Sequence, residues 1–337
     1  MPNPNSSVPT VEAIRYRRGY STPARLREDI KAAHQTDPWR TALTALADQL
    51  VIVAACIAAG ALLIAQPLAG VPLALLAAVL VGRQLRALEC LVHEGSHFNW
   101  SRKRRALNDF LAIALAAFPT GAQLSGYRES HLRHHGAFGT DDDPDRQRYR
   151  ELDLESLDRS RPGAFARGLL VRLPAYQRTW WRDSLQASPA VALLPLAWGA
   201  AFTAAPAWAV AGASAGLAAG AVWLAGFAVA LPILRFIGEA SEHVYSDADT
   251  VFDATVSNLG TTQRALIHPH GDGYHTVHHM WPGVPHHRLA RLHRRLMAAD
   301  PEYAARLRRR SGILATPVRG SRMTPAGPAT LTERTST

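Results

Sequence analysis

The chain has 337 residues, a formal net charge of +10 and a mean hydropathy of −0.07. Its basic residues are dispersed and accompany no DNA-binding or RNA-binding motif, which argues against a nucleic-acid partner. Its two cysteines, Cys56 and Cys90, are too few for a disulfide framework or a thiolate metal site. The moderate hydropathy averages two long apolar runs with a strongly charged remainder, so it does not exclude a membrane protein.

Two runs without Asp, Glu, Lys or Arg, residues 49–82 and 184–234, predict four membrane-spanning helices. A span needs roughly 20 apolar residues, so each run can form a helical hairpin. Gln66-Pro67 divides the first run, and either the Pro206 region or the Gly and Ser residues at 212–216 divide the second. We therefore expect spans at about 46–65, 68–87, 187–205 and 214–237.

A third uncharged run, residues 110–127, is long enough to cross a membrane on hydropathy alone. It contains Pro119, Gly121 and Gln123, which weaken a continuous span. A crossing here would also place the histidines before and after the run in opposite compartments. We therefore expect an interfacial or re-entrant helix at about 106–120.

The distribution of basic residues predicts the orientation of the chain. Lys and Arg lie outside the two hairpin turns, so both termini and all histidine motifs are expected in the cytoplasm. No cleavable signal peptide is evident, and the Arg-rich and Ala-rich composition indicates a bacterial inner-membrane protein. We expect a cytoplasmic segment 1–40 with its first 12 or so residues disordered, a membrane domain 41–298, and a largely disordered tail 299–337.

Eight of the fifteen histidines form three groups in the segments HEGSH, HLRHH and HTVHH. Spacings of three and four place the members of a group on one helix face. Neutral imidazole is a ligand for Fe, Zn, Cu or Ni, and eight imidazoles exceed what one tetrahedral zinc can use, so two metals are implied. The candidate ligands are His93, His97, His131, His134, His135, His275, His278 and His279.

Two other functional classes remain as weaker alternatives. HEGSH fits the His-Glu-x-x-His signature of zinc metalloproteases. A zincin needs only one further ligand, however, which leaves HLRHH and HTVHH unexplained. A non-enzymatic metal-binding or transport protein would favour polar residues inside the spans, whereas these spans are almost purely apolar.

The order of the three histidine motifs around a membrane hairpin resembles the integral-membrane fatty acid desaturase and hydroxylase superfamily over about residues 41–298. The resemblance implies an all-α membrane fold of four transmembrane helices in two hairpins, with a cytoplasmic helical cap that holds a histidine-rich site for two iron ions. It also implies O2 as co-substrate and a ninth ligand, His243 of GEASEH. Glu239 stands where acyl-CoA desaturases have Asn, and three roles stay open for it: metal ligand, holder of a bound water, or solvated helix end.

Metal-bound histidines usually donate their second ring N–H to a carboxylate or carbonyl. We expect such partners among the acidic residues near the three motifs: Glu94, Glu129, Asp141, Asp142, Asp143, Asp145 and Asp272. Glu242 is expected at the surface or in the same supporting role. Trp100 and Trp281 could line the site or anchor at the membrane interface, and we favour the interface. We interpret His34 and His293 as ordinary surface histidines.

The resemblance implies an O2-dependent oxidoreductase that removes hydrogen from an unactivated C–H bond with two electrons. A fatty acid desaturase is the favoured activity, and a hydroxylase of an acyl chain or another lipid-like substrate is the alternative. No segment resembles a fused electron-transfer domain, so we expect an external donor of the ferredoxin, rubredoxin or cytochrome b5 type with its reductase. The basic stretches Arg102 to Arg105 and Arg306 to Arg310 are candidates for docking that donor or for contacting anionic membrane lipids.

Overall fold

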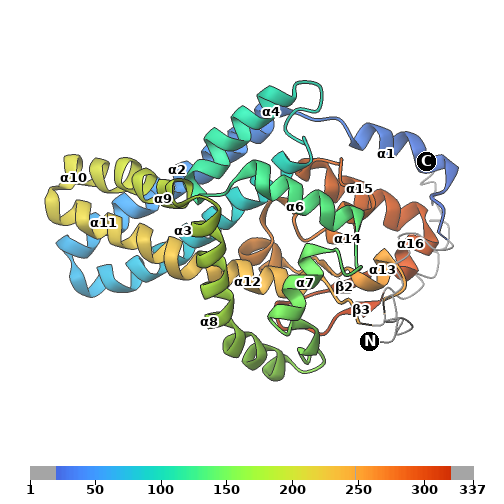
Figure 1. The fold of residues 1–337 in the computed structure, drawn as a ribbon. Coiled ribbons are helices and arrows are strands. Elements are labelled where there is room, and N and C mark those ends of the chain that lie inside the picture. Colours follow the sequence, from blue (N-terminus) through green and yellow to red (C-terminus); the bar gives the residue numbers. More distant parts are fainter. Residues whose placement is uncertain (1–19, 247, 320–337) are drawn as a thin grey trace, which may run out of the picture.

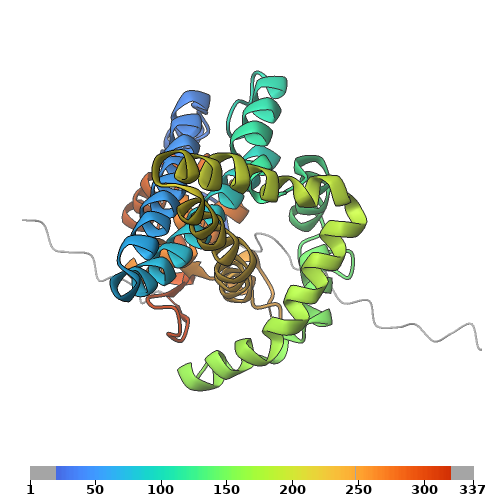
Figure 2. The same ribbon diagram turned by 90° about the vertical axis from the view of Figure 1, so that its left-hand side faces the viewer.

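The computed structural model describes residues 20–246 and 248–319. The segments expected to be disordered at 1–12 and from 320 onward lie outside the described residues. Long helices form a bundle at one end of the molecule, and shorter helices form a cap at the other end (Figure 1). Figure 2 looks onto the free end of the bundle and shows α8 to one side of the two hairpins.

The first hairpin consists of α2 (Pro38–Ala65) and α3 (Pro67–Ser96). Asp37 begins α2 as its N-cap, because its side chain accepts a hydrogen bond from the backbone N–H of Arg40 at 3.0 Å. Both helices are long and apolar enough to cross a membrane, as predicted. They extend beyond the expected spans at the cap end, so α3 carries the first histidine of HEGSH on its last turn.

The second hairpin consists of two composite helices that each contain a π-helical turn. Its first arm joins α9 (Pro189–Gly199), η4 (Ala200–Ala204) and α10 (Ala205–Ala211), and its second arm joins α11 (Ala213–Ala225), η5 (Gly226–Ala230) and α12 (Leu231–Glu242). The chain reverses at Gly212, whose φ of 87° suits glycine. Both arms are long and apolar enough to cross a membrane, which confirms the predicted number of four spans.

Small residues bring the two hairpins into close contact. A Cβ atom added to Gly60 of α2 would lie 2.7 Å from the carbonyl oxygen of Ala215 in α11. A Cβ atom added to Gly82 of α3 would lie 2.7 Å from the backbone nitrogen of Leu231 in α12. Small residues allow helix backbones to pack closely against one another. In a membrane this close packing stabilises helix association, because moving apolar side chains from lipid into a helix interface gives no hydrophobic stabilisation.

The ambiguous run forms a sharply bent helix pair. The segment Arg105–Thr120, which comprises α4 (Arg105–Ala112), η2 (Ile113–Ala117) and α5 (Phe118–Thr120), meets α6 (Leu124–Gly136) at an angle of 98°. Gly121, with φ of 71°, provides the left-handed backbone at the bend. The bend returns α6 to the end of α3, so HLRHH lies beside HEGSH.

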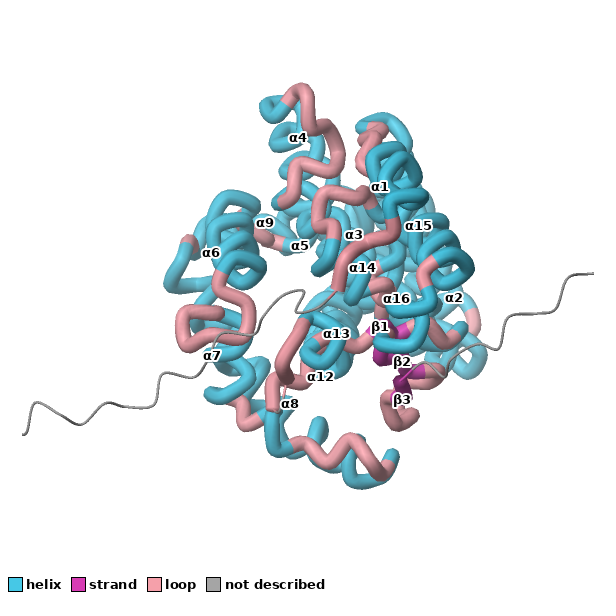
Figure 3. Tube along the Cα trace, turned by 90° about the vertical axis from the view of Figure 1, so that its right-hand side faces the viewer, coloured by secondary structure: helices cyan, strands magenta, loops and turns pink. Residues whose placement is uncertain are grey.

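Figure 3 looks onto the cap. The cap packs around its own apolar core. Its sheet is small, with β1 parallel to β2 and β2 antiparallel to β3. The helices, turns and strands of this part are η1 (Ala24–Leu26), α1 (Arg27–Ala33), α7 (Pro144–Glu151), η3 (Leu154–Ser156), α8 (Pro162–Ala187), α13 (Val251–Ala254), β1 (Ser257–Asn258), η6 (Gln263–Ile267), η7 (Pro269–Gly271), α14 (His275–Met280), α15 (His286–Ala299), α16 (Pro301–Arg306), β2 (Arg308–Arg310) and β3 (Val318–Arg319).

The architecture confirms the predicted all-α fold with four spans, but the segment after residue 299 differs from expectation. Residues 301–319 form α16, β2 and β3 instead of a disordered tail. Tyr303, Leu307 and Arg310 are each at most 1% exposed, because this segment packs against the cap. Burial of Arg310, which donates a hydrogen bond to the Ser241 hydroxyl at 3.1 Å, also removes it from the surface proposed for donor docking.

Three single-residue expectations are wrong. Trp100 is fully buried, and its indole N–H donates to the carbonyl of Leu91 at 2.8 Å, which closes the turn after HEGSH instead of anchoring at the interface. Trp281 is only 8% exposed and belongs to the cap core. His293 is likewise 8% exposed, and its Nδ1 lies 3.0 Å from the hydroxyl oxygen of Tyr303. His34 is half-buried and makes a local contact with the carbonyl of Ile30.

The contact at Gly60 gives a test of the hairpin packing. We expect Gly60→Ala to lower the free energy of unfolding by about 1–3 kcal/mol, because its methyl group overlaps the backbone of α11. Thermal unfolding of the purified protein in detergent measures the change. Gly163→Ala is the matched control, since no atom lies within 4 Å of its added Cβ. Equal stability of the two variants would contradict the close packing of α2 on α11.

Candidate metal centre

The three histidine motifs and GEASEH meet at the cap end of the helix bundle. His93 and His97 end α3, the histidines of HLRHH occupy the last two turns of α6, and the histidines of HTVHH lie on α14. His243 follows the last residue of α12. Four separate helices thus place nine imidazoles in one region. Every one of these imidazoles lies at the end of its helix or on a single face of it.

Five imidazoles from three helices form the first group: His93, His97, His131, His135 and His278. The Nε2 atom of His93 lies 2.8 Å from that of His131 and 3.0 Å from that of His278. The Nε2 atom of His135 lies 3.2 Å from that of His131 and 3.0 Å from that of His278. The Nε2 atoms of His97 and His131 are 2.9 Å apart. The group therefore surrounds a single point.

Four further imidazoles form the second group. The Nε2 atoms of His134 and His279 lie 3.3 Å apart, and those of His243 and His275 lie 2.9 Å apart. The rings of His275 and His279 join the two pairs, with centroids 4.6 Å apart. The rings of His135 and His279 are 4.5 Å apart, so the two groups are direct neighbours.

These side chains fit two metal ions. Two nitrogens that bind one metal at about 2.1 Å lie roughly 3.0–3.4 Å apart, which is close to the observed spacings. Burial lowers the pKa of His275 to about 3 and holds the pKa of His279 well below its ordinary value, so both rings are neutral, as metal ligands must be. The Nδ1 atom of His243 faces the carbonyl of Ala254 at 3.3 Å, which assigns the proton to Nδ1 and leaves a lone pair on Nε2.

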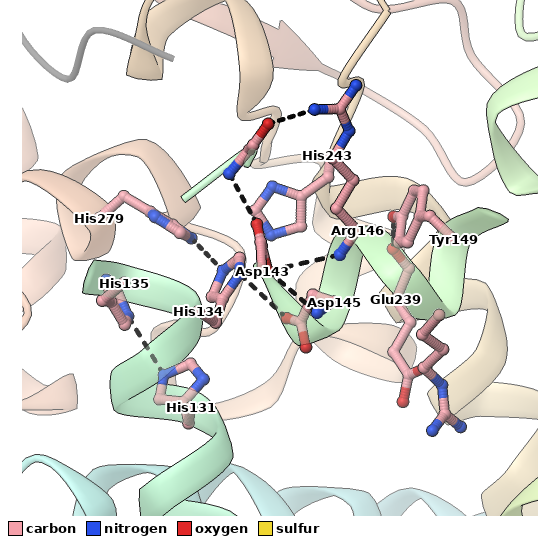
Figure 4. A network of polar contacts seen from close by, with 12 residues as sticks. His131, His134, His135, Asp143, Asp145, Arg146, Tyr149, Glu239, His243 and His279 are labelled. Carbon is pink, nitrogen blue, oxygen red and sulfur yellow. Dashed lines mark hydrogen bonds and ion pairs between the residues drawn. The ribbon is translucent and has the colours of Figure 1, made fainter. Parts of the chain in front are cut away.

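Asp143 orients His134 (Figure 4). Its Oδ1 atom lies 2.8 Å from Nδ1 of His134, and both side chains are at most 1% exposed. The same carboxylate accepts hydrogen bonds from the backbone N–H groups of Gly139, Asp145 and Arg146, which fix it at the start of α7. Asp145 is a second carboxylate near this ring, with Oδ2 3.5 Å from the same Nδ1. An imidazole held in this way presents Nε2 to the metal.

Three expected carboxylate partners face solvent instead. The side chain of Glu129 is 76% exposed and pairs with Arg133 one helical turn away. The side chain of Asp141 is 63% exposed and pairs with Arg150. Asp142 is also exposed. In the acidic loop, only the side chains at 143 and 145 therefore reach a motif histidine, because the turn before α7 directs the other two outward.

Two further expected partners contact other groups. Glu94 accepts a hydrogen bond from the backbone N–H of His286 at 2.7 Å, which connects α3 to the start of α15. Asp272 lies 2.9 Å from Nδ1 of His268 and accepts a hydrogen bond from Nη2 of Arg86 at 2.8 Å. These contacts join α3 to α15 and to the segment before α14.

His268 is a buried residue that the motif analysis missed. Its Nδ1 atom lies 2.9 Å from Oδ2 of Asp272 and 3.3 Å from Oε1 of Glu242, and its side chain is 0% exposed. Glu242 therefore supports this network instead of facing solvent. The available signal was the pair His268 and Asp272 four residues apart, immediately before HTVHH.

Glu239 lies outside both histidine groups. Its Oε1 atom accepts a hydrogen bond from the hydroxyl of Tyr176 at 2.8 Å, and its Oε2 atom lies 3.3 Å from Nε of Arg148. Glu239 nevertheless lines the same cavity as the histidines, which has a volume of about 290 Å³. In this structure the carboxylate thus forms part of the cavity wall.

The contrast between Asp143 and Asp141 gives a test of the centre. We expect Asp143→Asn to weaken metal binding by about 10–100-fold, because the amide keeps the shape but loses the charge that holds the His134 N–H. Metal retained after dialysis against a chelator series, measured by inductively coupled plasma mass spectrometry, reports the change. Asp141→Asn, in the same loop, should retain metal like the unmodified protein. Equal loss in both variants would contradict the assigned role of Asp143.

Comparison with known proteins supports the geometry. A family model described as Fatty acid desaturase matches residues 65–311, which include all nine clustered histidines. No curated protein matches the chain significantly. The match covers well over half of the sequence and agrees with four spans and a histidine-rich centre at their ends. The chain belongs to the fatty acid desaturase family.

Proposed function

We propose that this protein is a membrane-bound di-iron enzyme that introduces a double bond into an acyl substrate. The observation that carries the proposal is the division of nine clustered imidazoles into neighbouring groups of five and four. The family match supports desaturation as the reaction. Imidazole suits iron as well as zinc, and two nitrogen-rich sites side by side exceed the needs of a single hydrolytic zinc.

The reaction balances with O2 and an external reductant. Desaturation consumes O2, two electrons and two protons, removes two hydrogens from adjacent carbons and releases two waters. The bound iron ions would supply the O2-activating redox chemistry that amino-acid side chains lack. Hydroxylation with the same site is the alternative, in which one oxygen atom enters the substrate and one water is released.

The protein's own residues keep the ligands in position and limit access of water. Asp143 holds the His134 ring through Nδ1, and the carbonyl of Ala254 does the same for His243. Seven of the nine histidines are buried, which limits the access of water to the site. Positioning within a fraction of an ångström to about 1 Å decides between loss of a second hydrogen and oxygen transfer.

Two contacts weigh against the metalloprotease alternative. Glu94, which would be the general base of a zincin, is engaged with the backbone N–H of His286. His93 and His97 are grouped with three further imidazoles, which exceeds the three protein ligands of a catalytic zinc. HEGSH is therefore better explained as part of the five-histidine group.

The electron donor in this proposal is a separate protein of the ferredoxin, rubredoxin or cytochrome b5 type with its reductase. The enzyme sits in a bacterial inner membrane with the cap in the cytoplasm, where such donors are found. Four apolar spans support the membrane location. Exposed basic residues directly before α4, such as Lys103 and Arg104, offer a docking surface for an acidic donor or for anionic lipid.

Metal analysis and product analysis test the proposal together. Purified protein should contain two iron ions per chain, and His134→Ala and His278→Ala should lower that content because each removes a ligand from one group. The host lipids and small acids, analysed by mass spectrometry, should gain a double bond only with the unmodified enzyme. His34→Gln is the matched control, since His34 lies outside both groups. One zinc per chain, or normal iron content in both alanine variants, would contradict the proposal.

A further inference from the structure

His270 lies between two cavities of the protein. One is the cavity of about 290 Å³ beside the histidine groups, and the other is an open groove of about 620 Å³ along the start of α2. The side chain of His270 is 15% exposed and lines both of them. Leu43, which is 67% exposed, forms part of the groove wall, so the groove opens at the protein surface. This imidazole therefore separates the surface from the candidate metal centre.

Asp48 holds the His270 ring at this boundary. Its Oδ2 atom lies 2.6 Å from Nε2 of His270, and its side chain is only 7% exposed. Asp48 is the single acidic residue of α2, and ionisable side chains in membrane-spanning helices are rare and usually functional. Arg83 of α3 lies 4.0 Å from the same carboxylate, and Arg40 lines the groove beside it. The carboxylate thus faces one imidazole and two guanidinium groups.

The backbone of His270 is held in an unusual conformation. Its φ of 53° lies in the left-handed region, which residues with a side chain rarely adopt. Such conformations persist where the surrounding structure enforces them, and they cluster at functional sites. The centre of the His286 ring, which also lines the cavity beside the histidine groups, lies 5.6 Å from that of His270. The chain therefore fixes the His270 ring between Asp48 on the groove side and His286 on the cavity side.

The proposed reaction needs protons from solvent. Each desaturation takes up two protons, whereas seven of the nine clustered histidines are buried. Imidazole takes up and releases protons near neutral pH more readily than other side chains, and it is the usual proton shuttle in proteins. A histidine paired with a carboxylate at the boundary between an open groove and the cavity has the chemistry and the position for this task.

We propose that His270 and Asp48 form a proton-relay pair that connects the surface groove to the histidine-lined cavity. The hydrogen bond from Nε2 to Asp48 leaves Nδ1 to accept a proton that enters by the groove. The carboxylate stabilises the resulting imidazolium until Nδ1 releases a proton into the cavity, which restores the neutral ring. Only N–H bonds form and break. This inference rests on the proposed function, because the protons are consumed in the reduction of O2.

Chemical labelling tests whether solvent reaches His270. Full-length, iron-loaded protein in nanodiscs is treated with diethyl pyrocarbonate, which modifies accessible imidazoles, and peptide mass spectrometry locates the modified residues. We expect modification of His270 but not of the nearby His268, whose side chain is 0% exposed. An unmodified His270 under conditions that modify the half-buried His34 would overturn the inference.

Proton uptake tests the transfer itself. When chemically reduced protein reacts with O2 without substrate, reduction of O2 to H2O2 takes one electron from each iron and two protons from the medium. A pH-indicator dye in weakly buffered solution follows the uptake by stopped flow. His270→Asn tolerates the left-handed backbone and can hydrogen-bond to Asp48 but cannot carry a proton, so uptake should slow by about 10-fold or more. Asp48→Asn should also slow it, whereas His34→Gln should not.

Chemical rescue separates proton transfer from a purely structural role of the pair. His270→Gly also accepts the left-handed backbone and leaves space for a small base. Added imidazole should therefore restore part of the uptake rate in this variant without accelerating the unmodified protein. Uptake at the unmodified rate in His270→Asn, or no response of His270→Gly to imidazole, would overturn the relay.

Iron content measured in the same samples distinguishes the two proposals. Two irons per chain with unaltered uptake in His270→Asn would overturn only the relay. Absence of bound iron from the unmodified protein would overturn the proposed function and the relay with it.

Discussion

The structure depends on the convergence of nine imidazole nitrogens in a buried space. Nε2 atoms 2.8–3.3 Å apart bring their lone pairs together, an arrangement that bound cations stabilise. Each ring must also be neutral, which burial in the cap favours for His275 and His279. Four helices end at this point. Their lengths and the 98° bend between Arg105–Thr120 and Leu124–Gly136 together bring the histidine side chains to the same place.

A network of charged residues surrounds the centre on the bundle side. Arg86, Glu242, His268 and Asp272 connect α3, α12 and the segment before α14 through contacts of 2.8–3.8 Å. Buried charges of this kind are retained only where they are paired or take part in function. The four residues of this network pair with one another.

The sequence was sufficient for the number of spans and the grouping of histidine motifs, because apolar run length and helical spacing determine these features locally. It could not distinguish Asp143 from its three acidic neighbours, since the turn before α7 decides which carboxylate points inward. It also missed His268, whose partner Glu242 lies 26 residues earlier in the chain. Trp100 was misassigned for a related reason: a tertiary contact with Leu91 overrides the usual interfacial preference of tryptophan.

The most direct measurement of the central claim is anomalous X-ray scattering at the iron absorption edge from crystals of the iron-loaded protein. The account predicts two iron peaks per chain, one among His93, His97, His131, His135 and His278 and the other among His134, His243, His275 and His279. A single peak confined to HEGSH, or peaks that appear only at the zinc edge, would contradict it.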